Sequence, residues 1–141
     1  DSSAVNFALF SYMIGNTDWP MAYQHNTEMF FNGKKLVAIP YDFDHSGLVN
    51  AYYAKPNPML KISSVTERVY RGLCRRDPEV FSGIRDFYLS REENIYNTLN
   101  AYQDNFDEKE FNRLNTYIRS FFDIMRSDTE FKAKILSKCR G

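Results

Sequence analysis

The sequence predicts a mainly helical α+β domain. Apolar residues recur at helical spacing over most of the chain, and one Asn-Gly pair separates two short apolar runs. The length of 141 residues suits a single domain with its own hydrophobic core. Hydrophobic residues make up 43% of the chain and charged residues 26%, a globular composition that excludes disorder. We therefore expect residues 1–141 to form one domain.

The charge balance argues against nucleic acid and anionic membranes as partners, and the hydropathy argues against a transmembrane helix. The 18 basic and 18 acidic residues cancel, so no net field attracts nucleic acid or an anionic membrane. No run approaches the ~20 apolar residues that a transmembrane helix requires. The first residue is Asp1 rather than Met, which indicates a processed product or a piece of a longer polypeptide. The compartment stays open at this point.

The first element is predicted to be a helix that ends at Gly15. Apolar side chains recur at helical spacing before this glycine, and Ser2 or Ser3 suits the N-cap position. Glycine followed by asparagine is a usual stop signal for a helix. A loop then leads to the predicted hairpin.

Two short strands are predicted at residues 27–31 and 36–39. The Asn-Gly pair between them is the strongest short hairpin signal, and Pro40 lets the chain leave the second strand. Residues 48–62 contain two prolines and are expected to form an ordered loop.

The second half of the chain is predicted to be helical. Ser64 and Glu67 form a capping-box pattern for a helix that ends at Asp77-Pro78, and Pro78 starts the next helix. Further helices are expected to be capped by Ser90, Asp107 and Asp128. The full prediction is one N-terminal helix, a short hairpin, a long loop and four to five helices. The predicted helix that begins at Ser64 contains a basic cluster of Arg68, Arg71, Arg75 and Arg76. This cluster is interpreted as a solvated face or, alternatively, as a site for a phosphate or an acidic partner.

The two cysteines are too few for a disulfide framework or a zinc site. Cys74 lies within the predicted helix and is expected to be a small buried hydrophobe. Cys139 is expected to be a free thiol, and a disulfide between the two is the alternative.

Four polar residues surround the predicted hairpin. Asn26 comes directly before the first strand, and Asp42 follows the second, with Asp44 two residues on. A hairpin brings these two ends together, and the loop that contains Asp18 should lie beside them. Carboxylate and amide oxygens suit a hard cation such as Mg²⁺. The pattern therefore predicts a metal site at this end of the hairpin.

The order of these residues resembles that of kinase-fold phosphotransferases, which use a catalytic-loop Asp, a catalytic-loop Asn and a metal-binding Asp. Asn16-Thr-Asp18, His25-Asn26 and Ile39-Pro-Tyr-Asp-Phe-Asp44 resemble the CotH and HipA families of atypical kinases. Residues 14–50 also resemble secreted or periplasmic CotH-like proteins of Bacteroidetes. The resemblance covers residues 1–60 well and the helical remainder loosely, and the loop between Asp18 and Asn26 is longer than in protein kinases.

The resemblance implies the large lobe of a protein-kinase-like fold with defined site residues. Asp18 is implied to be catalytic, orienting the acceptor hydroxyl or taking its proton. Asn26 and Asp42 are implied to bind metal, and Asp44 to be a second ligand or a loop-stabilising acid. The implied cofactors are Mg²⁺ or Mn²⁺ and ATP, and the implied substrate is a hydroxyl of a protein or small molecule.

Each site residue also has a structural interpretation. Asp18, Asn26, Asp42 and Asp44 could be turn or loop residues that bond their own backbone. Possible supporting residues follow the same two interpretations. His25 could brace the loop or act as a general base. Trp19 could pack the loop or stack on a nucleobase. His45 could be a loop residue or a transition-metal ligand.

The chain lacks the nucleotide cover of a kinase. Its six glycines are scattered, and only one predicted helix precedes Asp18. We therefore expect a C-terminal lobe whose partner is the missing N-terminal lobe of the same polypeptide, and no robust phosphoryl transfer by this chain alone. Two alternatives are a degenerate kinase-fold module for binding or surface assembly, and a metal-dependent hydrolase that uses Asp42, Asp44 and both histidines.

Overall fold

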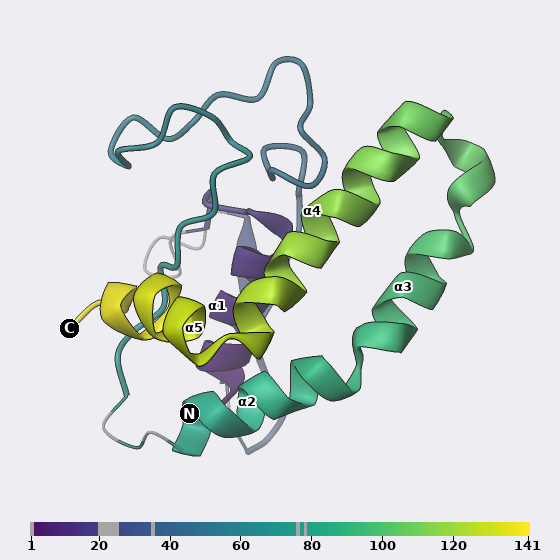
Figure 1. The fold of residues 1–141 in the computed structure, drawn as a ribbon. Coiled ribbons are helices and arrows are strands. Elements are labelled where there is room, and N and C mark those ends of the chain that lie inside the picture. The colour runs from purple at the N-terminus through teal and green to yellow at the C-terminus, as the bar shows by residue number, and fades with distance from the viewer. Residues whose placement is uncertain (1, 20–25, 35, 76, 78) are drawn as a thin grey trace. The chain divides into compact units, whose positions relative to one another are not determined.

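The computed structural model describes residues 2–19, 26–34, 36–75, 77 and 79–141. These residues contain five α-helices and one two-stranded antiparallel sheet, so the mainly helical α+β prediction is confirmed. The chain forms two compact units, one of Asp1–Cys74 with Lys138–Gly141 and one of Arg75–Ser137 (Figure 1). No helix in the described part of the chain is long and apolar enough to cross a membrane.

Helix α1 (Ser2–Ile14) is the buried centre of the first unit. It ends where the sequence predicts, because Gly15 has a φ of 68° and its N–H donates to the carbonyl of Tyr12. The ring of Phe10 meets Phe43 edge-on, and Tyr12 meets Tyr70 in the same way. These contacts show that the segment after the hairpin wraps around α1.

The hairpin consists of β1 (Thr27–Phe31) and β2 (Leu36–Pro40), as predicted, with Pro40 as the last residue of the second strand. The strands pair from Thr27 opposite Pro40 to Phe31 opposite Leu36. The N–H of Tyr41 donates to the carbonyl of Asn26, so the pairing continues one residue beyond the strands. The hairpin therefore fixes the spacing between the residues that enter it and those that leave it.

The helix predicted to begin at Ser64 does not form, and residues 61–75 are irregular. The capping-box contact exists, since Glu67 accepts the N–H of Ser64, but it closes only a local turn. Gly72 lets the segment approach α1 closely, because a Cβ there would lie 2.8 Å from the Cβ of Ala8. The segment packs against α1 through the buried Tyr70, whose ring meets Tyr12, rather than forming a helix of its own.

The second unit contains α2 (Glu79–Ser90), α3 (Glu92–Asn100), α4 (Glu108–Arg126) and α5 (Asp128–Lys134). Helix α4 is the long helix of this unit in Figure 1, and it contacts the other three. The core of the unit contains fully buried side chains from α4, namely Phe121, Phe122 and Met125. Four α-helices thus follow the hairpin in the described residues.

The helix caps agree with the prediction in one case and differ in two. Asp107 caps α4, as predicted, by accepting the N–H of Glu110 at 2.8 Å. The N-cap of α5 is Ser127 rather than Asp128, and the N-cap of α3 is Arg91 rather than Ser90. Ser90 instead donates its hydroxyl to the carbonyl of Phe87.

Cys74 and Cys139 form a disulfide, so the alternative of a pairing is confirmed and the expectation of a buried Cys74 and a free Cys139 is wrong. Both cysteines belong to the first unit, and the second unit is the insertion between them. The parallel bridge between Leu73 and Arg140 brings the two cysteines together. A separation of 65 residues gave no sequence signal for this pairing.

We predict that the double variant Cys74→Ser, Cys139→Ser loses about 2–4 kcal/mol of unfolding free energy, because the disulfide limits the conformational entropy of a long loop in the unfolded chain. Urea unfolding followed by circular dichroism measures the change. Wild-type protein reduced with a dithiol is the matched control and should unfold at the same urea concentration as the variant. Equal unfolding midpoints for the variant and the oxidised wild type would contradict the prediction.

Candidate functional site

The loop after α1 places Asp18 by local hydrogen bonds. The side chain of the buried Asn16 accepts the N–H of Asp18 at 2.9 Å, which forms an Asx turn. Trp19 is 2% exposed, donates its indole N–H to the carbonyl of Asn16 at 2.8 Å, and packs edge-on against Phe7. Trp19 therefore packs the loop, which is the structural one of its two interpretations.

Asn26 and Asp18 contact each other directly. The amide nitrogen of Asn26 donates to Oδ2 of Asp18 at 3.0 Å. Asn26 is nearly buried and has a φ of 52°, a left-handed conformation that Asn tolerates better than most residues. The sequence order thus brings the predicted catalytic Asp and the predicted metal-binding Asn together at the start of β1.

Asp42 lies two residues beyond β2 and also has a left-handed backbone, with a φ of 55°. The N–H of Tyr41 donates to the carbonyl of Asn26, so Asp42 is the first residue after this backbone pair. Two left-handed residues of the site flank the hairpin on its entry and exit. Such conformations cluster at functional sites because the surrounding structure must hold them in place.

Asp44 belongs to a small polar cluster with Asp42, His45 and Tyr53. Burial alone would raise the pKa of Asp44, but hydrogen bonds with Asp42 and Tyr53 and the nearby His45 outweigh it and lower the pKa. The Nε2 atom of His45 lies 3.9 Å from Oδ2 of Asp44. The hydrogen bond to Asp44 also raises the pKa of Tyr53. The cluster therefore favours an ionised Asp44.

A pocket of about 290 Å³ joins the Asp18 loop to the segment after the hairpin. It is lined by Thr17, Asp18, His45, Lys55, Pro56, Asn57 and Pro58. Asp18 and His45 therefore face the same cavity. Lys55 and Asn57 were not predicted as site residues, although the prolines on both sides of Asn57 signal a rigid segment.

The predicted metal site would draw its donors from the described residues. No three His, Cys, Asp or Glu side chains among them gather into a metal site. The predicted set is two carboxylates, Asp42 and Asp44, with the amide of Asn26. Because the nitrogen of that amide bonds to Asp18, its oxygen is the atom that could bind a cation. Mg²⁺ is often held by one or two carboxylates together with water and phosphate oxygens, so this donor set fits its chemistry.

Two further predictions from the sequence concern His25 and the basic cluster. His25 lies outside the described residues. Of the basic cluster, Arg76 lies outside the described residues, and Arg68, Arg71 and Arg75 are not on a helix, because the predicted helix does not form. Arg68 donates to the carbonyl of Met13 at 3.1 Å, and Arg71 donates to the carbonyl of Thr17. These two arginines therefore bind the end of α1 and the Asp18 loop.

Comparisons of the chain with protein-family models, with curated proteins and with solved structures find no match.

We predict that Tyr53→Phe raises the pKa of Asp44 toward its usual value of 3.8, because the hydroxyl that stabilises the carboxylate is removed. Carboxyl chemical shifts followed by NMR across a pH titration measure the change. A folded-state pKa below the unfolded one stabilises the fold at pH values above the unfolded pKa, and this effect is lost as pH falls through the folded pKa. The variant should therefore be destabilised at neutral pH, and not at pH values below the folded pKa of Asp44. Tyr52→Phe is the control, since Tyr52 is 98% exposed, and an unchanged Asp44 titration in Tyr53→Phe would contradict the prediction.

Proposed function

We propose that this chain is the C-terminal catalytic lobe of a kinase-like phosphotransferase. In the full-length polypeptide it would transfer a phosphoryl group from ATP to a hydroxyl of a protein or small molecule. The observation that supports this most is the hydrogen bond from Asn26 to Asp18, at the end of the hairpin that leads to Asp42. Kinase-fold phosphotransferases use an Asp, an Asn and a second Asp in the same chain order.

Two contacts of Asp18 support the role of an acceptor-activating carboxylate. Asp18 lines the pocket, and the hydrogen bond from Asn26 fixes the orientation of its carboxylate. A carboxylate held in this way would orient an acceptor hydroxyl in the pocket and accept its proton. Lys55 in the same lining favours an acceptor that carries negative charge near its hydroxyl.

Asn26, Asp42 and Asp44 would hold Mg²⁺ or Mn²⁺. The metal would neutralise the charge on the phosphates of ATP during transfer. The lowered pKa of Asp44 keeps its carboxylate ionised, which metal binding requires.

A second lobe is part of the proposal. The scattered glycines of the sequence provide no phosphate-binding loop, so an N-terminal lobe of the same polypeptide would cover the nucleotide. The Cys74–Cys139 disulfide is typical of oxidising compartments, which supports a secreted, periplasmic or cell-surface location.

A degenerate kinase-fold module for binding or surface assembly is the second candidate. It is favoured by large apolar side chains exposed on the hairpin and on the loop after it. Phe30 and Phe31 are 59% and 61% exposed, and Met59 is 90% exposed. Such a module would bind no nucleotide. No observation in the described residues favours the metal-dependent hydrolase.

We predict that Asp42→Asn in the full-length polypeptide abolishes Mn²⁺ binding and phosphoryl transfer. Asp18→Asn should keep Mn²⁺ binding and lower transfer by about 10²–10⁴-fold, because it removes only the group that accepts the proton. Electron paramagnetic resonance of Mn²⁺ and transfer of labelled phosphate from ATP measure the two effects. Asp104→Asn, an exposed position in the second unit, is the control for charge.

Unchanged metal binding and transfer in Asp42→Asn would contradict the proposal. A full-length wild type whose thermal unfolding temperature does not respond to Mg²⁺ and ATP would favour the binding module instead.

A further inference from the structure

Arg71 contacts both neighbours of Asp18. Its guanidinium donates to the carbonyl of Thr17, and the same group lies 5.6 Å from the centre of the Trp19 ring. The planar guanidinium of arginine can donate hydrogen bonds and stack on an aromatic face at once, which lysine cannot do in the same geometry. Arg71 therefore braces the Asp18 loop from a segment that lies 54 residues away along the chain.

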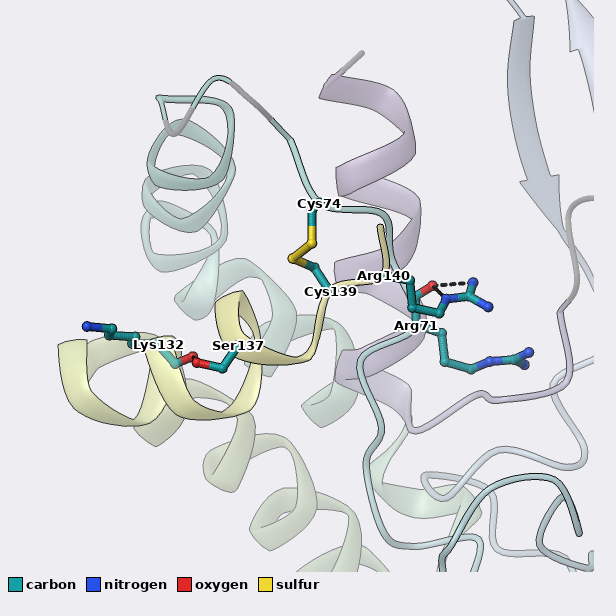
Figure 2. The surroundings of a disulfide bond; sticks show 6 residues. All are labelled: Arg71, Cys74, Lys132, Ser137, Cys139 and Arg140. Carbon is teal, nitrogen blue, oxygen red and sulfur yellow. Dashed lines mark hydrogen bonds between the residues drawn. A yellow bond between two sulfur atoms is a disulfide. The ribbon is translucent and has the colours of Figure 1, made fainter.

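The backbone around Arg71 is held by the C-terminal residues. The guanidinium of Arg140 donates to the carbonyl of Arg71, with its Nε at 2.9 Å (Figure 2). The backbone N–H of Arg140 donates to the carbonyl of Gly72 at 2.9 Å, and the carbonyl of Arg140 accepts the N–H of Cys74 at 2.7 Å. The disulfide between Cys74 and Cys139 ties the same two segments together covalently.

The other side of the Arg71 segment is fixed to α1. Gly72 lies so close to α1 that a Cβ there would be 2.8 Å from Ala8, and Arg68 donates to the carbonyl of Met13 at 3.1 Å. The segment is thus held between α1 on one side and the C-terminal residues on the other. A shift in its backbone would move the guanidinium that holds Thr17 and Trp19.

We propose that Arg71 is a positioning residue for Asp18, and that the Cys74–Cys139 disulfide holds Arg71 in place by keeping Arg140 bonded to it. The effect on catalysis rests on the proposed function, whereas the effect on the loop does not. Opening the disulfide would release the C-terminal residues from Arg71 and Gly72 and loosen the Asp18 loop. Small misplacements of a catalytic group cost about 10²-fold in rate.

Trp19 gives a direct readout because it is the only tryptophan of the chain and is 2% exposed. The variants are Arg71→Met, which keeps the apolar stem, and Arg71→Lys, which keeps the charge. Lys61→Met is the control, since it removes one charge from an exposed side chain in the same unit. Reduction of the disulfide uses dithiothreitol, which supplies two electrons and two protons and becomes a cyclic disulfide.

We expect Arg71→Met and Arg71→Lys to shift Trp19 emission to longer wavelength and to increase its quenching by iodide. The amide of Asp18 should exchange its hydrogen faster in both variants, and Lys61→Met should match the wild type. Reduction should shift the emission of wild-type protein in the same direction but should cause little further shift in Arg71→Met, because contacts in one network are not additive.

Two results would overturn the proposal. One is that both Arg71 variants show the same Trp19 emission wavelength and the same quenching by iodide as the wild type. The other is an equal shift on reduction in wild type and Arg71→Met, which would mean that the disulfide acts on Trp19 without Arg71. Should Arg71→Met fail to fold, Arg71→Lys and reduction of the wild type decide the question by the same comparison.

Transfer by the full-length polypeptide separates this proposal from the proposed function. Arg71→Met should lower kcat by about 10²-fold and leave the Kd for Mn²⁺ unchanged, since the metal ligands are not touched. A wild type without transfer would end the proposed function, while the fluorescence comparison would still decide the role of Arg71. An unaltered kcat in Arg71→Met with transfer present would overturn the positioning role.

Discussion

The carbonyl groups at the C-terminal end of α1 each need a hydrogen-bond donor, because the last turn of a helix leaves them without partners inside the helix. Seven consecutive carbonyls, from Ser11 to Thr17, accept such bonds. Local residues supply three of the donors, and the other four come from residues 47, 48, 68 and 71. The rest of the first unit depends on this constraint, since it draws the later segments around one end of one helix.

This arrangement also determines where the chemistry lies. The Asp18 loop begins at the same helix end, so the donors that complete the helix also hold the loop. The hairpin then returns the chain to this point and leaves Asn26 bonded to Asp18. The left-handed backbones of Asn26 and Asp42 are maintained by these surroundings. The fold of the first unit and its candidate site are therefore stabilised by the same interactions.

Local signals predicted the elements whose causes are local. Gly15 ended α1, the Asn-Gly pair formed the hairpin, and Asp107 capped α4, because each depends on residues a few positions apart. The capping box at Ser64 was also real, but the helix it predicted did not form. Burial of Tyr70 against Tyr12 of α1 outweighed the helical propensity of that segment, and no local pattern reports such a contact.

The sequence by itself determined the helical class, the hairpin and the order in which Asp18, Asn26 and Asp42 occur. Only the tertiary structure placed Lys55 in the pocket with Asp18, paired Cys74 with Cys139, and aimed Arg71 at the Asp18 loop. The physical reason is sequence separation. Hydrogen bonds within a turn are encoded by neighbouring residues, whereas contacts between residues far apart along the chain depend on how the whole unit packs around α1.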